Sequence, residues 1–203
     1  MPSLAQLRRQ IRARRRDIPA SERRQAAHHL ARRVTSLRVF ATAQQIAGFL
    51  AFDGEIDPTP LLERALEMGK TVYLPVLAGS NPQAHLLFAP YRPGDTLKPN
   101  RFGIPEPQVI ADRLLSPQRM DLVLTPLVAF DSSGTRLGMG GGFYDRTFAF
   151  LQNPGHLHKP CLLGLAYELQ KVAQLPRQPW DVPVDGIATE AALYHYGSDF
   201  LLE

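Results

Sequence analysis

The sequence predicts an α/β protein with a three-layer α/β/α, Rossmann-like arrangement, in which a mainly parallel, mixed sheet lies between two layers of helices. Short apolar segments alternate with amphipathic segments of helical period along most of the 203 residues, a pattern typical of parallel strands joined by helices. Hydrophobic residues make up 44% of the chain, enough for one sizeable core, and neither a linker nor a repeat interrupts the pattern. We therefore expect a single domain over residues 1–203.

The N-terminal part is predicted to be helical and basic. Ser3 can cap a helix that ends before Pro19 and whose apolar residues recur every three or four positions. A second helix follows at once, with one apolar stripe from Ala27 to Leu37. This basic helical segment, residues 3–38, holds eleven arginines against two acidic residues. Such clusters bind nucleic acid, anionic membranes or phosphorylated small molecules. We favour a solvated helix face for most of these arginines, because no aromatic residue for base stacking accompanies them.

From residue 45 onward, strand-like and helix-like segments alternate. Prolines are frequent in 77–117, where helical periodicity is weak. Ligands of doubly wound sheets bind where parallel strands end, so chemically active residues are expected just after the strands. The expected strands are 45–52, 71–76, 84–91, 122–130, 161–166 and 186–189, and the expected helices are 60–68 and 143–151.

The strongest functional signal is a stretch with four glycines within five residues, 138–142. Glycines reach positive φ and let a ligand approach the main chain, so N–H groups between a strand and a helix can converge on an anion. The stretch matches neither the P-loop nor the dinucleotide fingerprint. Arg136 and Arg146 can pair with phosphate oxygens, and Asp145 is an oxygen ligand suited to Mg²⁺. A glycine-rich hairpin or a tight connection without a ligand is the alternative.

Acidic residues gather at two further places. Three carboxylates at 53–57 follow an expected strand, and their spacing fits a metal or ligand site as well as a solvated loop in which Asp57 caps the next helix. Near the C-terminus, Asp181 or Asp185 can supply a second acid beside Asp145, because Mg²⁺ bound with ATP takes only one or two protein carboxylates.

Composition argues against several classes of protein. None of the six histidines forms a zinc-binding spacing or stands beside a serine in a nucleophile elbow, so zinc enzymes and serine hydrolases have little support. Cys161 is the single cysteine, and we expect it to be a buried strand residue of a cytoplasmic protein. No segment approaches eighteen apolar residues, so neither secretion nor membrane spanning is expected.

Five segments of the chain resemble the 5-formyltetrahydrofolate cyclo-ligase family, also called methenyltetrahydrofolate synthetases. Their order and spacing agree with the family across essentially the whole chain. The glycine run, with Arg-Leu-Gly before it and aromatic-Tyr-Asp after it, is the most specific. The five segments are RLGMGGGFYDR (136–146), FLAFDGEI (49–56), YLPV (73–76), NRFGIPEP (100–107) and WDVP (180–183).

This resemblance implies a fold of the NagB/RpiA/CoA-transferase-like type and a ligase that depends on ATP and Mg²⁺. The implied reaction converts 5-formyltetrahydrofolate to 5,10-methenyltetrahydrofolate and releases ADP and phosphate, through phosphorylation of the formyl oxygen and attack by N10. We expect a monomer whose ligands are the folate and ATP, with neither nucleic acid nor a membrane as a partner.

The resemblance also implies the residues of the site. The implied catalytic residues are Arg136 and Tyr144, and the implied magnesium ligands are Asp145 and Asp181. The implied ATP contacts are Arg8, Arg136, Leu137, Gly138, Met139, Gly140, Gly141, Gly142, Phe143 and Tyr144. The implied substrate contacts are Leu50, Glu55, Met139, Gly140, Gly141, Gly142 and Phe143.

One position departs from the family pattern. Relatives contact the nucleotide through a lysine and an arginine four residues apart; Arg8 matches the arginine, but Leu4 stands in the place of the lysine. Arg9 or Arg12 can substitute, or the helix engages ATP differently. Two rival functions remain at this point. One is a sugar-phosphate isomerase of related fold that is indifferent to ATP, and the other is a nucleic-acid-binding protein that acts through residues 1–38.

Overall fold

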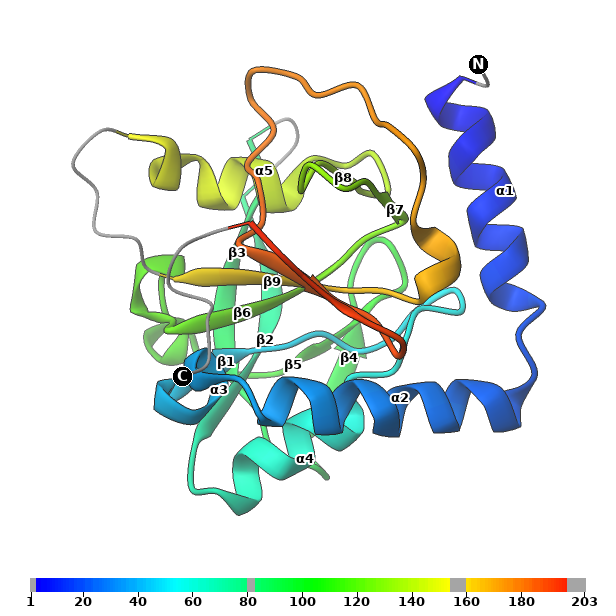
Figure 1. Cartoon of the computed structure of the whole chain (residues 1–203). Coiled ribbons are helices and arrows are strands. Elements are labelled where there is room, and N and C mark those ends of the chain that lie inside the picture. The colour runs from blue at the N-terminus through cyan, green and yellow to red at the C-terminus, as the bar shows by residue number, and fades with distance from the viewer. Residues whose placement is uncertain (1–2, 80–82, 154–159, 197–203) are drawn as a thin grey trace.

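Seven strands form the central sheet, and the inner five run parallel (Figure 1). The computed structural model describes residues 3–79, 83–153 and 160–196. The two edge strands pair antiparallel with their neighbours, so the sheet is mixed and mainly parallel, as predicted. In their order across the sheet, the strands are β11 (Leu193–His195), β10 (Gly186–Ala188), β9 (Cys161–Leu165), β6 (Leu122–Pro126), β1 (Gln45–Ala47), β2 (Thr71–Ala78) and β3 (His85–Pro90).

Helices cover both faces of this sheet, which confirms the predicted three-layer α/β class. One face carries α2 (Ala20–Thr35), α3 (Arg38–Thr42) and α4 (Thr59–Glu67), and the other carries α5 (Phe143–Phe148) (Figure 1). The structure therefore has the layered form in which a parallel sheet is buried on both sides.

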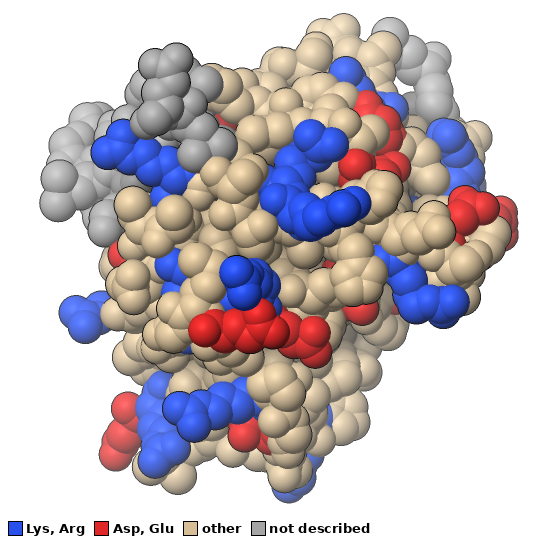
Figure 2. Space-filling view, turned by 60° about the horizontal axis from the view of Figure 1, so that its bottom comes forward, with Lys and Arg blue, Asp and Glu red and all other residues tan. Residues whose placement is uncertain are grey.

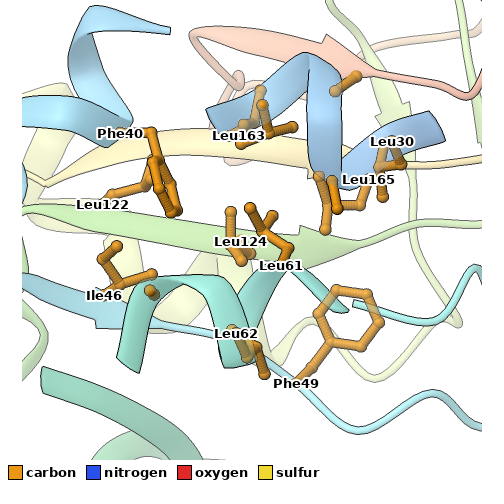
Figure 3. Packing of buried hydrophobic residues seen from close by; sticks show 14 of the residues in the cluster. Leu30, Phe40, Ile46, Phe49, Leu61, Leu62, Leu122, Leu124, Leu163 and Leu165 are labelled. Atoms are coloured by element: carbon orange, nitrogen blue, oxygen red, sulfur yellow. The ribbon is translucent and has the colours of Figure 1, made fainter. Parts of the chain in front are cut away.

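Alternating strand side chains build a separate core on each face. In β6, Leu122 and Leu124 belong to the cluster under α2 and α4, whereas Val123 belongs to the cluster on the α5 side. This follows from the two-residue period of a strand. Figure 3 shows Leu30 of α2 and Leu61 of α4 among the strand leucines of the first cluster. Each fully buried leucine of this kind contributes about 2 kcal/mol through its removal from water.

Helix α1 (Leu4–Arg16) lies outside these two layers, beside a short hairpin of β7 (Ala129–Phe130) and β8 (Arg136–Leu137) (Figure 1). Ser3 begins the helix as predicted, through a reciprocal pair of capping hydrogen bonds with the residue three positions on. Ile11 is buried against the hairpin. The helix is thereby fixed at the end of the sheet rather than on one of its faces.

The remaining elements are short connections. A second hairpin pairs β4 (Leu97–Pro99) with β5 (Pro105–Pro107) inside the proline-rich segment. Within the described residues, no helix combines the length and the apolar composition needed to cross a bilayer. Short 3₁₀ helices occupy Ala111–Arg113, Pro117–Arg119, Ala149–Gln152 and Glu168–Gln170.

Several expected elements are shorter in the structure than in the prediction. The strand expected at 45–52 ends at Ala47, and the strand expected at 122–130 divides into β6 and β7. Pro126, which has no N–H to continue the ladder, is the last residue of β6. The glycines consequently follow the β7–β8 hairpin and not a strand of the main sheet. Cys161 begins β9 and is half-buried, not fully buried as expected.

Candidate active site

A cleft of about 940 Å³ opens where β1 and β6 end. Leu50 follows β1, Leu127 follows β6, and both line the cleft together with Pro75 of β2. Its walls come from α1, the β4–β5 hairpin, the glycine-rich stretch and the segment around Trp180. The cleft therefore lies at the predicted carboxyl edge of the parallel strands, and its volume is in the range of small-molecule sites.

The glycine loop, residues 138–142, forms one wall. Gly140 and Gly142 have φ values of 102° and 63°, a region that residues with a Cβ rarely adopt. Arg8 of α1 and Arg146 of α5 each donate a hydrogen bond to a carbonyl oxygen of the loop, at 2.8 and 2.7 Å. The loop therefore brings main chain and two guanidinium groups to the cleft. The following helix, α5, has only six residues, so the cations contribute more positive charge here than the helix.

Arg136 and Asp145 form an ion pair beside this loop. The Nη2–Oδ1 distance is 2.7 Å, and the Arg136 side chain is 6% exposed. Arg136 also donates to the carbonyl oxygen of Val182, and the Val182 N–H donates to Asp145 Oδ1 at 3.2 Å. Among the described residues, both hydrogen bonds to the Asp145 carboxylate thus end on Oδ1, and Oδ2 is the oxygen with which it can bind a cation.

Asp181 shares the cleft with Asp145, and Asp185 does not line it. The Asp185 carboxylate accepts the Leu162 N–H at 2.7 Å, at the sheet. Asp181 accepts the Gln178 N–H at 2.8 Å in the segment that borders the cleft. Of the two acids considered from the sequence, Asp181 is therefore the one that lines the same cleft as Asp145.

Tyr144 follows the glycine loop and lines the cleft. Its ring stacks on Phe148, with 6.2 Å between the ring centroids. Burial raises the pKa of the Tyr144 phenol well above its usual value, and the negative charge of Glu55 raises it further. The phenol is consequently protonated at neutral pH and can donate a hydrogen bond to a ligand.

Glu55 stands on the other wall, after β1. Its side chain is 11% exposed, its Oε2 accepts the Phe52 N–H at 3.2 Å, and its Oε1 lies 4.0 Å from Arg15 Nη1. Burial raises the pKa of the Glu55 carboxyl to about 7, although the Arg15 guanidinium acts to lower it. A carboxyl group in this setting can both accept hydrogen bonds from a ligand and titrate near neutral pH.

The three acids at 53–57 do not converge on one point. Asp53 is paired with Arg12 and Arg16 of α1, at 2.5 and 3.2 Å. Partial burial acts to raise the pKa of Asp53, but the guanidinium groups outweigh it and lower that pKa. Asp57 accepts the N–H of Thr59 at the start of α4, at 2.9 Å. Asp53 and Asp57 therefore have separate partners, on α1 and at the start of α4.

Three exposed aromatic side chains that the sequence analysis did not assign to the site line the cleft together with Met139. Phe52, Phe102, Met139 and Trp180 line it while 45–66% exposed, and the Phe102 ring lies 5.5 Å from that of Phe143. Only Met139 among these four was expected at the site, from the family resemblance. The sequence signal that could have revealed the others is an exposed aromatic residue in a loop that follows no helical or strand period.

The β4–β5 hairpin, which carries Phe102, is fixed by polar contacts over a long sequence separation. Glu106 Oε1 accepts hydrogen bonds from Asn100 Nδ2 at 2.6 Å and from the Leu77 N–H at 3.0 Å. The side-chain oxygen Oδ1 of Asn100 accepts the N–H groups of residues 102 and 104. These bonds hold the hairpin over the cleft.

At the N-terminal helix, Arg8 reaches the glycine loop and Leu4 lines the cleft beside it. Arg12, one of the two arginines that could substitute for the missing lysine, is paired with Asp53. Most other arginines of the basic helical segment are exposed, as expected. Figure 2 shows basic and acidic side chains interspersed over the face that carries α2 and α4.

A family model described as the 5-formyltetrahydrofolate cyclo-ligase family matches residues 1–190. The chain belongs to this family. The 5-formyltetrahydrofolate cyclo-ligase of Escherichia coli K12 is 41% identical over 186 residues, which cover 92% of this chain and 100% of that protein. The cyclo-ligase of Haemophilus influenzae is 41% identical over 179 residues, which cover 88% of this chain and 93% of that protein. The protein is therefore an enzyme, a ligase of folate metabolism with 5-formyltetrahydrofolate cyclo-ligase activity.

Solved structures of this family share the fold. The NMR structure of the 5,10-methenyltetrahydrofolate synthetase from Aquifex aeolicus superimposes with a TM-score of 0.78 at 30% identity and covers 98% of this chain and 96% of its own. The synthetase from Mycoplasma pneumoniae superimposes with a TM-score of 0.71 at 21% identity, and the match covers 93% of this chain and 99% of that one. Membership of the cyclo-ligase family favours a folate enzyme over both rival functions, the sugar-phosphate isomerase and the nucleic-acid-binding protein.

Proposed function

We propose that this cyclo-ligase uses ATP and Mg²⁺ to convert 5-formyltetrahydrofolate to 5,10-methenyltetrahydrofolate, with release of ADP and phosphate. The observation that carries this proposal is that a single cleft combines an arginine-bound glycine loop with a wall of exposed aromatic side chains and one buried carboxyl group. The first part suits a polyphosphate, and the second suits a flat heterocycle with polar edges.

On the nucleotide side, main-chain N–H groups of the glycine loop and nearby guanidinium groups hold the phosphates. Their charges lie where negative charge develops during phosphoryl transfer, which needs alignment and charge neutralisation rather than a protein nucleophile. The proposed ATP contacts are Arg8, Arg136, Leu137, Gly138, Met139, Gly140, Gly141, Gly142, Phe143 and Tyr144.

Asp145 and Asp181 are the proposed holders of Mg²⁺. Both line the cleft, and carboxylate oxygens from one or two residues are what this ion takes from protein when it is bound with ATP. When bound, the ion would neutralise phosphate charge and orient the terminal phosphoryl group. Arg136 neutralises the Asp145 carboxylate through Oδ1, so the two acids need not repel one another when the ion is absent.

On the folate side, Glu55 accepts hydrogen bonds from the donor edge of the pterin, and the apolar wall packs against its rings. In this proposal, Leu50 and Glu55 contact the folate from the loop after β1. Residues 139–143 contact both the folate and ATP. Phe102 and Trp180 add exposed aromatic surface to the same wall, which favours stacking on a heterocycle.

In the proposed reaction, the formyl oxygen of the substrate attacks the terminal phosphorus of ATP. A P–O bond to the formyl oxygen forms as the bond to ADP breaks. N10 then attacks the formyl carbon and loses its proton, and phosphate leaves with the former formyl oxygen. Arg136 binds the transferred group, and the protonated Tyr144 donates a hydrogen bond to it. No water or protein nucleophile is consumed.

The direct test follows the near-ultraviolet absorbance of the methenyl product when purified protein is mixed with 5-formyltetrahydrofolate and Mg·ATP. We expect an increase that requires all three components and that stops when the metal is chelated. An equal rate without ATP would contradict the proposal. The same preparation, in light scattering, is expected to behave as a monomer, and it is expected to show no salt-sensitive binding to nucleic acid.

A further inference from the structure

Helix α1 contacts both halves of the cleft. Near its start, Arg8 Nε donates to the carbonyl oxygen of Gly138 in the glycine loop at 2.8 Å. One to two turns later, Arg12, Arg15 and Arg16 bind Asp53 in the loop that carries Glu55. The rise of an α-helix places Arg8 and Arg15 about 10 Å apart along one rigid element. A single position of α1 therefore has to satisfy both sets of contacts.

Asp53 is held in an unusual conformation by these contacts. It is the only residue other than glycine with positive φ, at 52°, among the residues that the structure describes. Its side chain is 10% exposed, and its main-chain carbonyl accepts the Arg15 Nη2 hydrogen bond at 3.0 Å. A positive φ costs an L-residue about 1–2 kcal/mol, least for Asp and Asn. The ion pairs with α1 offset that cost.

The conformation of Asp53 sets the turn that presents Glu55. The Glu55 N–H donates to the Phe52 carbonyl at 3.1 Å, and the Phe52 N–H donates back to Glu55 Oε2 at 3.2 Å. Asp53 lies inside this closed turn. Arg15, which is fully buried, also donates to the carbonyl of Leu127 at 3.2 Å. The helix, the turn and the end of β6 are thereby joined in one network.

We propose that Asp53 is a positioning residue that couples the two halves of the cleft, so that a nucleotide bound at the glycine loop strengthens folate binding at the Glu55 turn. Through Asp53, α1 transmits its position from the Arg8 end to the Glu55 end. The coupling is reciprocal, because a ligand that fixes α1 favours the other ligand by the same factor. This inference rests on the proposed use of ATP and 5-formyltetrahydrofolate by the same cleft.

The test measures the dissociation constant of 5-formyltetrahydrofolate by titration calorimetry, with and without a saturating Mg²⁺ complex of the β,γ-imido analogue of ATP. In the native protein we expect the analogue to tighten folate binding at least about fivefold. Asp53→Asn keeps the shape and the tolerance of positive φ but removes the charge. It is expected to bind each ligand alone while the ratio of the two dissociation constants falls to about one. Asp57→Asn, a matched change of an exposed acid in the same loop, is expected to keep the native ratio.

Arg12→Gln provides a second variant in case Asp53→Asn folds poorly, because it removes the shortest of the ion pairs and leaves Asp53 in place. It is also expected to abolish most of the coupling. A native ratio in both variants would overturn the positioning role, and so would a ratio near one in the native protein when both ligands bind. If the native protein bound neither ligand, the proposed function itself would fail, which separates the two outcomes.

Discussion

The two walls of the cleft are built on different physical principles. The glycine loop depends on main-chain conformation, because Gly140 and Gly142 have positive φ. Two arginine side chains donate hydrogen bonds to its carbonyl oxygens. The Glu55 wall depends on buried charge, because Oε1 of the largely buried Glu55 carboxyl lies 4.0 Å from Nη1 of the fully buried Arg15 guanidinium. The loop wall therefore responds mainly to changes in local backbone preference, and the Glu55 wall responds to changes in charge and pH.

The largest effect is expected for Asp145→Asn, at the ion pair beside the glycine loop, where we propose that the metal ion binds. The amide still accepts the Val182 N–H but loses the charge for the metal ion, so kcat/KM should fall at least about 100-fold and the Mg²⁺ concentration for half-maximal rate should rise. Because Arg136 is 6% exposed and keeps its charge, the loss of the ion pair costs about 3 kcal/mol of stability, below a typical total of about 5–15 kcal/mol. Steady-state kinetics over a range of Mg²⁺ concentrations, with thermal unfolding alongside, measures both.

Asp95→Asn is the matched control for this change. Asp95 is an exposed acid whose carboxylate accepts the Arg92 N–H in a turn, so we expect its replacement to leave the rate and the Mg²⁺ dependence unchanged. A native Mg²⁺ dependence in Asp145→Asn would remove Asp145 from the proposed metal site.

The next largest effect is expected for Gly140→Ala, which changes only the backbone preference of the loop. At a φ of 102° a Cβ costs about 1–2 kcal/mol in strain, and relief of that strain would move the loop. We expect the KM for ATP to rise about tenfold and the KM for the folate to change less. Gly69→Ala adds the same strain at a φ of 76° in a turn outside the cleft, where a Cβ meets open space, and should lower stability without altering either KM. Equal KM values in the two variants would contradict a conformational role for the loop.

Glu55→Gln probes the other wall through pH. Because burial raises the folded-state pKa of Glu55 from 4.5 to about 7, its contribution to stability is complete below pH 4.5 and is lost as pH rises through 7. Relative to Glu55→Gln, the native protein should therefore lose about 3 kcal/mol of unfolding free energy across this interval. Denaturant unfolding at a series of pH values measures the difference. Parallel stability curves for the two proteins would mean that Glu55 is not buried in this way.

The smallest effect is expected for Leu4→Lys, which restores the lysine of the family pattern. Leu4 lines the cleft near Arg8, so an added ammonium group should tighten ATP binding by at most about fivefold, the worth of one partly exposed charge pair. ATP affinity by titration calorimetry decides this. A weaker affinity would show that the apolar side chain is needed where it stands.

The same contrast explains what the sequence could predict. The layers of the fold and the glycine loop follow from local period and from residues with a special backbone preference, and both kinds of signal lie within a short window of sequence. The pairing of Asp53 with Arg12, Arg15 and Arg16 joins residues 37 to 41 positions apart, and no local pattern encodes it. The basic helix was expected to be mostly solvated, and one of its arginines is instead fully buried.

The β4–β5 hairpin was missed for a related reason. Its strands have only three residues each, rich in proline, so neither shows a two-residue period. Its position over the cleft depends on the bond from the Leu77 N–H to Glu106, 29 residues away. The first strand of the β7–β8 hairpin, Ala129–Phe130, lies within the apolar run 122–130 that we expected to form one strand. The turn of this hairpin is held by Asp131, which accepts hydrogen bonds from the residues two and four positions on.

The central claim is that the two walls act on one reaction, so the most direct measurement is the amount of ADP formed per methenyltetrahydrofolate formed. ADP by a coupled assay and the methenyl product by absorbance can be followed in the same mixture. The account predicts one ADP for each product molecule and negligible ADP when 5-formyltetrahydrofolate is left out. Product without ADP, or ATP turnover at the same rate without the folate, would contradict it.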